Sequence, residues 1–194
     1  MNSRPEWTPG QVLSPEHLTP AVIAAIKGTL FPPQIVALTA WAEARSRYES
    51  GRGWIANPID AMADIVNVID NRAHDPRWEF KGHVGICLQR WQFSCWEPKG
   101  GPDDPTDPDD LAENFESLME RAQWLVAGKD PSPKLGACLS VAEAFIDGRH
   151  ENMLGEGVTH YYAAWLPKIP FWAIHLSSEF VCERYGHRFY RNVP

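Results

Sequence analysis

One carboxylate stands out because of the residues that precede it. The stretch QIVALTAWAEARSRYE, residues 34–49, has no charged residue from Gln34 to Ala42 and then reaches Glu43. On a helical wheel its apolar side chains surround almost the whole circle, which indicates a helix buried on most sides. Burial disfavours an ionised carboxylate, and the negative end of the helix dipole acts in the same direction, so we expect a raised pKa for Glu43. Such a carboxyl group can give a proton to a leaving oxygen near neutral pH, as the general acid of glycoside cleavage does.

A purely structural role for Glu43 fits the same pattern. The carboxylate would then form an ion pair with Arg45, Arg47 or Arg72, and ion-pair networks also perturb pKa values. Helical periodicity alone does not separate the acid from the ion pair.

Two helices are predicted to form the centre of the fold. The first runs over about 33–45 and is apolar all round, so it should be the buried central helix. A loop at 45–58, marked by glycines and a proline, separates it from a helix over 59–73. That second helix has a broad apolar face and a stripe of polar side chains at helical spacing, namely Asp60, Asp64, Asn67 and Asn71.

The rest of the chain supplies elements that pack on this pair. A short helix is predicted at 18–28, and two amphipathic helices at 110–128 and 135–148, each ended by a glycine. The segment 97–110 reads as an acidic, proline-rich loop, and the aromatic, β-branched tail predicts short strands and turns. We therefore expect a mainly α (α+β) domain over 34–194 with a small β or irregular C-terminal element, preceded by an extension over 1–33 that packs on it.

Composition narrows the classes of partner. The chain has 194 residues and a formal net charge of −7, which argues against nucleic acid as a partner because phosphate binding needs a cationic surface. No polybasic segment or signal peptide is recognisable, and the longest early apolar run, AVIAAI, is too short to be one. We expect a monomer without stable membrane association.

Cysteine and histidine usage does not point to a metal or a cofactor. The four cysteines are far apart and include no C-x-x-C pair, so buried free thiols are favoured, although one or two disulfides stay open. His83 and Cys87 are four residues apart, and Cys182 and His187 are five apart, but a paired-ligand motif such as H-E-x-x-H is missing from the sequence. We therefore expect neither metal nor cofactor.

Six short motifs, taken in order, resemble one family. They are WAEAR at 41–45, DIVNVIDNR at 64–72, QFSCW at 92–96, THYYA at 159–163, PFWA at 170–173 and YGHRFYR at 185–191. Together they resemble the germination-type cell-wall hydrolases, which are SleB/CwlJ-like peptidoglycan hydrolases. The resemblance implies a lysozyme-like fold that cleaves the glycan strands of peptidoglycan. It also implies that Glu43, the glutamate of the AEAR motif, is the catalytic acid.

A hydrolytic glycosidase needs a second carboxylate besides the acid. The candidates are Glu49, Asp60 and Asp64, although for each of them a solvated helix or loop charge is the favoured interpretation. If none lies opposite Glu43, this residue can first donate its proton and then act as base, with the C6 hydroxyl of muramic acid as internal nucleophile. That is the lytic transglycosylase route.

The same motifs supply candidates for binding the glycan. Aromatic rings can support pyranoses, and hydroxyl and amide groups can bond to sugar substituents. Strand alternation places Tyr161 and Tyr162 on opposite faces, and Tyr161 is the preferred contact. For Asn71 a structural hydrogen bond is an equal alternative, and for His187 a structural role is the more common one. The full set is Gln92, Phe93, Ser94, Trp96, Thr159, His160, Tyr161, Tyr162, Asn71 and His187.

The resulting expectation is a muramidase-type enzyme, a lytic transglycosylase that cleaves between N-acetylmuramic acid and N-acetylglucosamine. Without a recognisable leader it fits a phage endolysin, made in the host cytoplasm and released to the cell wall. The alternatives are a hydrolytic muramidase with a second carboxylate, a non-catalytic peptidoglycan-binding module, and a zinc amidase.

Overall fold

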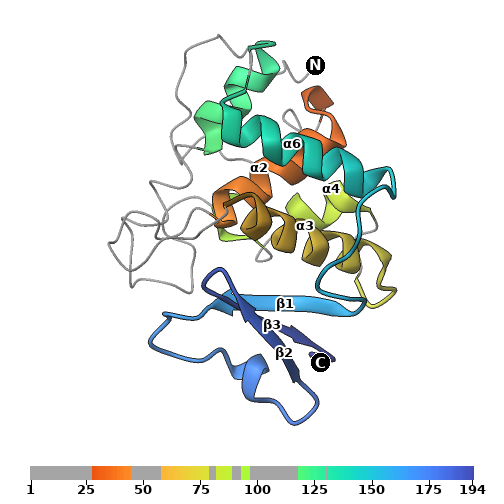
Figure 1. Cartoon of the computed structure of the whole chain (residues 1–194), viewed down its shortest axis with the longest axis vertical. Coiled ribbons are helices and arrows are strands. Elements are labelled where there is room, and N and C mark those ends of the chain that lie inside the picture. The colour runs from red at the N-terminus through yellow and green to blue at the C-terminus, as the bar shows by residue number, and fades with distance from the viewer. Residues whose placement is uncertain (1–27, 45–57, 79–81, 89–92, 97–117, 130) are drawn as a thin grey trace, which may run out of the picture.

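The structure is a mixed α+β fold. The computed structural model describes residues 28–44, 58–78, 82–88, 93–96, 118–129 and 131–194. Figure 1 shows the described helices gathered at one end and a three-stranded sheet at the other, with β1 running along α3. The expectations for the short helix at 18–28, the loop at 45–58 and the acidic loop at 97–110 lie outside the described residues, apart from the helical turn at 28–29.

Helix α2 (Pro32–Ala44) is the buried central helix that the sequence predicts. It begins at two prolines, and the Gln34 side chain accepts a hydrogen bond from the Phe31 backbone N–H at 2.8 Å, which caps the first turn. Most of the helix is buried, because it lies between α3 and α6 (Pro133–Ile146) and contacts both. Its buried residues are Ile35, Val36, Ala37, Leu38, Thr39, Ala40, Ala42 and Ala44.

Helix α3 (Pro58–His74) confirms the second predicted helix and divides the fold in two. Its apolar face, which includes Ile65 and Ile69, enters the helical core. Its polar stripe does not face solvent: Asp64, Asn67 and Asn71 are all buried. Asn71 bonds to the Val158 carbonyl and Asp64 pairs with Arg184, so polar groups of the stripe join the helices to the sheet.

The remaining helices close the core around this pair. Helix α6 starts at Ser132, whose hydroxyl accepts a hydrogen bond from the Leu135 N–H, and confirms the predicted helix near 135–148. Residues 118–126 are helical, which confirms the described part of the predicted helix at 110–128. Helix α4 (His83–Leu88) was not predicted, because six residues are too few for a periodic pattern.

The C-terminal tail forms an antiparallel sheet in the order β1-β3-β2, as the predicted short strands require. The strands are β1 (Val158–Ala163), β2 (Glu179–Arg184) and β3 (His187–Arg191). Tyr185 and Gly186 form the tight turn between β2 and β3 with φ of 49° and 79°. Only glycine fits the second position, since a Cβ there would lie 2.7 Å from the Trp165 ring. A short 3₁₀ helix, η3 (Phe171–Ile174), interrupts the connection from β1 to β2, where the sequence suggested only strands and turns.

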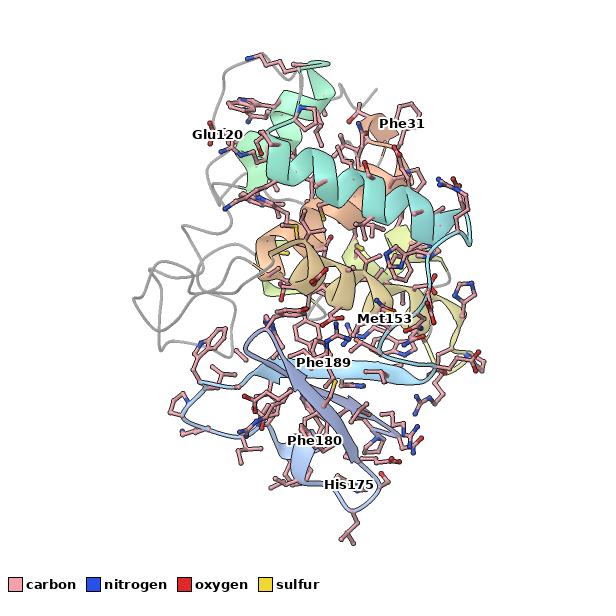
Figure 2. The ribbon with its side chains drawn as sticks, viewed as in Figure 1. Phe31, Glu120, Met153, His175, Phe180 and Phe189 are labelled. Carbon is pink, nitrogen blue, oxygen red and sulfur yellow. The ribbon has the colours of Figure 1, made fainter. Side chains whose placement is uncertain are left out.

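Each face of the sheet has its own small apolar cluster. The face toward α3 packs Val158 and Phe189 against Val68, while the opposite face gathers Tyr162 and Tyr190. Figure 2 shows Phe189 beside the helices, and Phe180 and His175 toward the far end of the molecule. Among the described helices, none combines the length and the apolar character that crossing a membrane would require.

Candidate active site

Glu43 lies where the helices meet the sheet. It is the second-last residue of α2, and the residue as a whole is half-buried. The Tyr161 hydroxyl, from β1, donates a hydrogen bond to Glu43 Oε2 at 2.8 Å. The backbone N–H of Cys95 donates to Oε1 at 3.4 Å. Both carboxyl oxygens are therefore held by groups that are 118 and 52 residues away in the chain.

Hydrogen bonds that start from Trp96 explain why the Cys95 backbone N–H lies at the Glu43 carboxyl. Cys95 belongs to the 3₁₀ helix η2 (Ser94–Trp96), which contacts α2. The Trp96 indole N–H donates to Thr39 Oγ1 at 2.8 Å, and the Thr39 hydroxyl donates to the Ile35 carbonyl at 2.8 Å. Thr39 is one helical turn before Glu43 on the same face. Anchoring Trp96 there fixes η2 beside the carboxyl.

The environment raises the pKa of Glu43. Desolvation by the surrounding protein is the largest cause, since it disfavours the charged form. The hydrogen bonds from Tyr161 and Cys95 and the positive charge of Arg72 act in the opposite direction without cancelling it. The result agrees with the direction expected from the apolar helix. A carboxyl group of this kind can hold a proton at a higher pH than an ordinary glutamate.

Arg72 is the buried cation of the site. It lies in the last turn of α3, is 5% exposed, and donates a hydrogen bond from Nε to the Thr159 carbonyl at 2.6 Å. Its guanidinium lies 4.6 Å from the Trp78 ring centroid and 5.2 Å from that of Phe93. Burial lowers the pKa of Arg72 to about 10, which leaves it charged at neutral pH. Its charge therefore acts on Glu43 across the interface between helices and sheet.

The two adjacent tyrosines point to opposite faces, as strand alternation predicts. Tyr161 faces the helices, where it contacts Glu43 and lies edge-on to His187 with 5.3 Å between ring centroids. Tyr162 faces the other way and packs against Tyr190 and Trp172. The expectation that Tyr162 contacts the glycan beside Glu43 is corrected by this placement.

Several predicted glycan contacts belong to the core. Phe93, Trp96 and Thr159 are 1%, 4% and 0% exposed, so their side chains cannot stack on or bond to a sugar in this structure. The sequence missed this because aromatic and hydroxyl residues in a motif read the same whether they meet substrate or the core. Ser94 lies in η2, but its side chain and the whole of Gln92 are outside the described parts.

Asn71 has the structural role that the sequence left open. Its side-chain amide donates to the carbonyls of Gly155 at 3.0 Å and Val158 at 2.9 Å, and accepts from Asn152 at 2.8 Å. These bonds tie the last turns of α3 to the segment that enters β1. Asn71 is therefore corrected from a glycan contact to a residue that positions β1.

The two histidines of the predicted set are both neutral near pH 7. His160 is half-buried, with its ring 5.1 Å from that of Trp172 and 5.9 Å from that of Trp78. Burial and the charge of Arg72 lower the pKa of His160 to about 4. His187 is 3% exposed, and burial lowers its pKa to about 4 as well. His187 packs on Tyr161 and is corrected from a glycan contact to a structural residue, whereas His160 keeps some accessible surface.

Two of the three candidate second carboxylates, Asp60 and Asp64, contact the β2–β3 hairpin. Asp64 lies 3.2 Å from Arg184 Nε in a buried ion pair, and burial still raises its pKa to about 6. Asp60 accepts a hydrogen bond from the Tyr185 hydroxyl at 3.0 Å. Both aspartates thus serve the contact between α3 and the turn of the β2–β3 hairpin. Glu49 lies outside the described residues.

All four cysteines are free thiols, as favoured from the sequence. Cys87, Cys95 and Cys138 are buried and Cys182 is half-buried. Burial raises the pKa of Cys87 and of Cys138 to about 12, so these thiols stay protonated. The His83–Cys87 spacing does not form a ligand pair, because Cys87 lies in the core and His83 contacts Asp70.

Sequence reasoning did not assign the Cys95 N–H or the Arg72 charge to the site. A backbone donor leaves no trace in residue types, so Cys95 could not have been found. Arg72 was considered as an ion-pair partner of Glu43 and, together with Asn71, as a donor of a structural hydrogen bond to a neighbouring loop. Its position at the end of the polar stripe, next to Asn71, was the available signal.

Comparisons with known proteins gave no relatives. No family model, curated protein or solved structure matches this chain. The functional assignment therefore depends on the geometry around Glu43 and on the order of the sequence motifs.

Replacing Tyr161 by phenylalanine should raise the pKa of Glu43 further. The hydroxyl stabilises the ionised carboxylate by donating to it, so its removal favours the protonated form. Carbon-13 NMR titration of labelled glutamate carboxyls would measure this directly. Tyr162→Phe is the matched control, because that hydroxyl lies on the other face. A Glu43 pKa that falls in Y161F, or moves equally in Y162F, would contradict the geometry.

His187 should make the fold less stable in acid. Its pKa is about 4 in the folded protein and about 6.5 when unfolded, so the unfolded chain takes up the proton first as the pH falls. Stability from the buried neutral ring is complete above about pH 6.5 and is lost progressively toward pH 4. Between pH 7 and 5 the wild type should lose about 2 kcal/mol more unfolding free energy than His187→Gln. Urea titrations at both pH values test this, and the exposed His175→Gln should follow the wild type.

Proposed function

We propose that this chain is a peptidoglycan-degrading glycosidase with a lysozyme-like fold and that Glu43 is its catalytic acid. The bond cleaved would be the one between N-acetylmuramic acid and N-acetylglucosamine. The observation that carries this proposal is a half-buried glutamate whose carboxyl pKa is raised by desolvation and whose two carboxyl oxygens are both hydrogen-bonded.

The geometry around Glu43 suits proton donation. A general acid needs a pKa near the working pH, and it must also be held still with one face open. The contacts from Tyr161 and Cys95 restrict the carboxyl, and Glu43 as a residue is half-buried at the end of α2. Arg72 limits the pKa rise, so that the group can also release its proton to the substrate.

Among the described residues, both candidates for a second carboxylate, Asp60 and Asp64, contact the β2–β3 hairpin, which favours the transglycosylase route over direct hydrolysis. Glu43 would protonate the glycosidic oxygen as the bond from that oxygen to C1 of the muramic acid breaks. The resulting carboxylate would then take the proton from the C6 hydroxyl, whose oxygen forms a new bond to C1. The products are a 1,6-anhydromuramoyl end and a free hydroxyl on the glucosamine unit, and Glu43 ends protonated as it began. The placement of Asp60 and Asp64 at the hairpin supports this route.

The sequence motifs favour the same substrate. WAEAR contributes Glu43, DIVNVIDNR contributes Arg72, QFSCW contributes Cys95 and THYYA contributes Tyr161. Four motifs that are far apart in the sequence thus each supply a residue to the cluster around the Glu43 carboxyl. This convergence supports the resemblance to cell-wall hydrolases, and a phage endolysin is the biological setting that we propose.

Mass spectrometry of digested peptidoglycan tests the proposal. Purified sacculi incubated with the protein should release muropeptides with anhydromuramoyl ends. Reducing muramic acid ends would select the hydrolytic muramidase instead. Free peptides would overturn a glycosidase in favour of an amidase. Retention of the protein on sacculi without any soluble product would leave only a binding module.

A further inference from the structure

Three side chains with metal-binding atoms converge where α3 ends and α4 begins. Asp70 and His74 are one turn apart on α3, and His83 is the first residue of α4. Their ligand atoms all lie within 4.8 Å of one another. The three residues belong to neither the Glu43 cluster nor the contacts that hold β1.

The distances bring the three side chains close enough together to share one metal ion. His83 Nε2 lies 2.8 Å from Asp70 Oδ1, and His74 Nδ1 lies 3.4 Å from the same oxygen. Ligands about 2.0–2.2 Å from a tetrahedral ion are separated by roughly 3.3–3.5 Å, so small rotations of the side chains would accommodate one. The His74 and His83 rings lie edge to face with centroids 5.8 Å apart, which keeps the imidazoles from blocking each other.

The donor set selects the class of cation. Two imidazole nitrogens and one carboxylate oxygen suit Zn²⁺ and related first-row transition ions, whereas Ca²⁺ and Mg²⁺ prefer oxygen ligands throughout. Asp70 and His83 are 21% and 18% exposed, so they are partly preorganised, while His74 at 72% is open to solvent. An ion held here would thus be reached easily from solution.

We propose that Asp70, His74 and His83 form a binding site for a zinc-class divalent cation that fastens α4 to the end of α3. The expectation from sequence was that no metal binds, because a paired-ligand motif such as H-E-x-x-H is missing from the sequence. The cation would also steady the turn that carries Asn71 and Arg72, which anchor β1. This proposal does not depend on the proposed glycosidase, since none of its three residues takes part there.

A simpler arrangement uses the same atoms without metal. The Asp70 carboxylate can accept hydrogen bonds from the imidazoles, and His74 Nδ1 also lies 2.9 Å from the Asp70 carbonyl. In that case His74 Nδ1 carries a proton and is closed to metal. The two arrangements differ in whether the wild type takes up a stoichiometric ion.

Cobalt substitution and thermal unfolding of the full, untagged chain test the site. Co²⁺ added to wild type should give the visible absorption of a single low-symmetry site, and excess Zn²⁺ should remove it. Saturating Zn²⁺ should raise Tm by about 5 °C or more. In His74→Ala the affinity for both ions should fall at least about tenfold and the Tm shift should disappear.

Two further variants make the outcome unambiguous. His175→Ala removes another exposed histidine and should bind as the wild type does. Asp70→Asn keeps the shape and should weaken binding like His74→Ala. Absence of a Co²⁺ spectrum in the wild type, or equal binding in H74A and H175A, would overturn the site. Because His74 is largely exposed, its replacement should not unfold the chain.

Discussion

Glu43→Gln should cleave glycan about 10²–10⁴-fold more slowly than the wild type, in the activity that we propose, while remaining folded. Glutamine has the shape of glutamate and can still accept hydrogen bonds through its amide oxygen, but it has no proton to donate. The remaining rate would come from binding and orientation alone. Release of soluble muropeptides from purified peptidoglycan, followed over time, measures the effect.

The matched control for this variant is Glu143→Gln, an exposed glutamate on α6 that should keep full activity. Denaturant unfolding should show E43Q at least as stable as wild type, because a neutral amide is easier to bury than a carboxyl that can ionise. Undiminished product release by E43Q would remove Glu43 from the mechanism. Loss of activity together with loss of folding would instead show a structural residue.

Arg72→Met should destabilise the fold by about 3 kcal/mol. The change removes a charge-assisted hydrogen bond to the Thr159 carbonyl and the stacking of the guanidinium on Trp78 and Phe93. It also leaves that carbonyl buried without its donor. Arg72 Nη1 is buried without a hydrogen-bond partner among the described residues. The substitution removes this unsatisfied group, which offsets part of the cost. Urea unfolding monitored by tryptophan fluorescence measures the difference.

The matched control is Arg149→Met, which removes an exposed ion pair with Asp147 and should cost less than about 1 kcal/mol. Arg72→Lys keeps the charge and loses the planar fork, so it should lie between wild type and R72M. R72M should also raise the pKa of Glu43, since it removes a positive charge that stabilises the carboxylate. Equal stabilities of R72M and R149M would contradict the anchoring role of Arg72.

The helices were predictable because their signals are local. Helix α2 lies within one residue of its predicted limits at each end, and α3 extends the predicted range by one residue at each end. Their apolar residues recur at helical spacing and prolines mark where they begin. Helix α4 and the 3₁₀ helices were missed since three to six residues carry no periodicity.

The site was predictable only in part, because it is assembled across the chain. Glu43 could be found from an apolar helix that ends in an acid, and strand alternation predicted that Tyr161 and Tyr162 face opposite ways. Phe93 and Trp96 were wrongly placed at the glycan, since sequence alone does not say which side of a ring meets the core. The spacing of the polar stripe on α3 did not reveal that Asn71 bonds to the entrance of β1 or that Asp64 pairs with Arg184 of β2.

The attachment of β1 to α3 has a consequence for how activity would be lost. Three bonds from Asn71 and Arg72 end on backbone carbonyls of residues 155–159, at the entrance to the sheet. If the strands detach as a unit, Tyr161 leaves Glu43 although the helical bundle stays intact. Amide hydrogen exchange should then show the strands opening at a lower free energy than α2. Enzymatic inactivation on warming would precede the loss of helical circular dichroism.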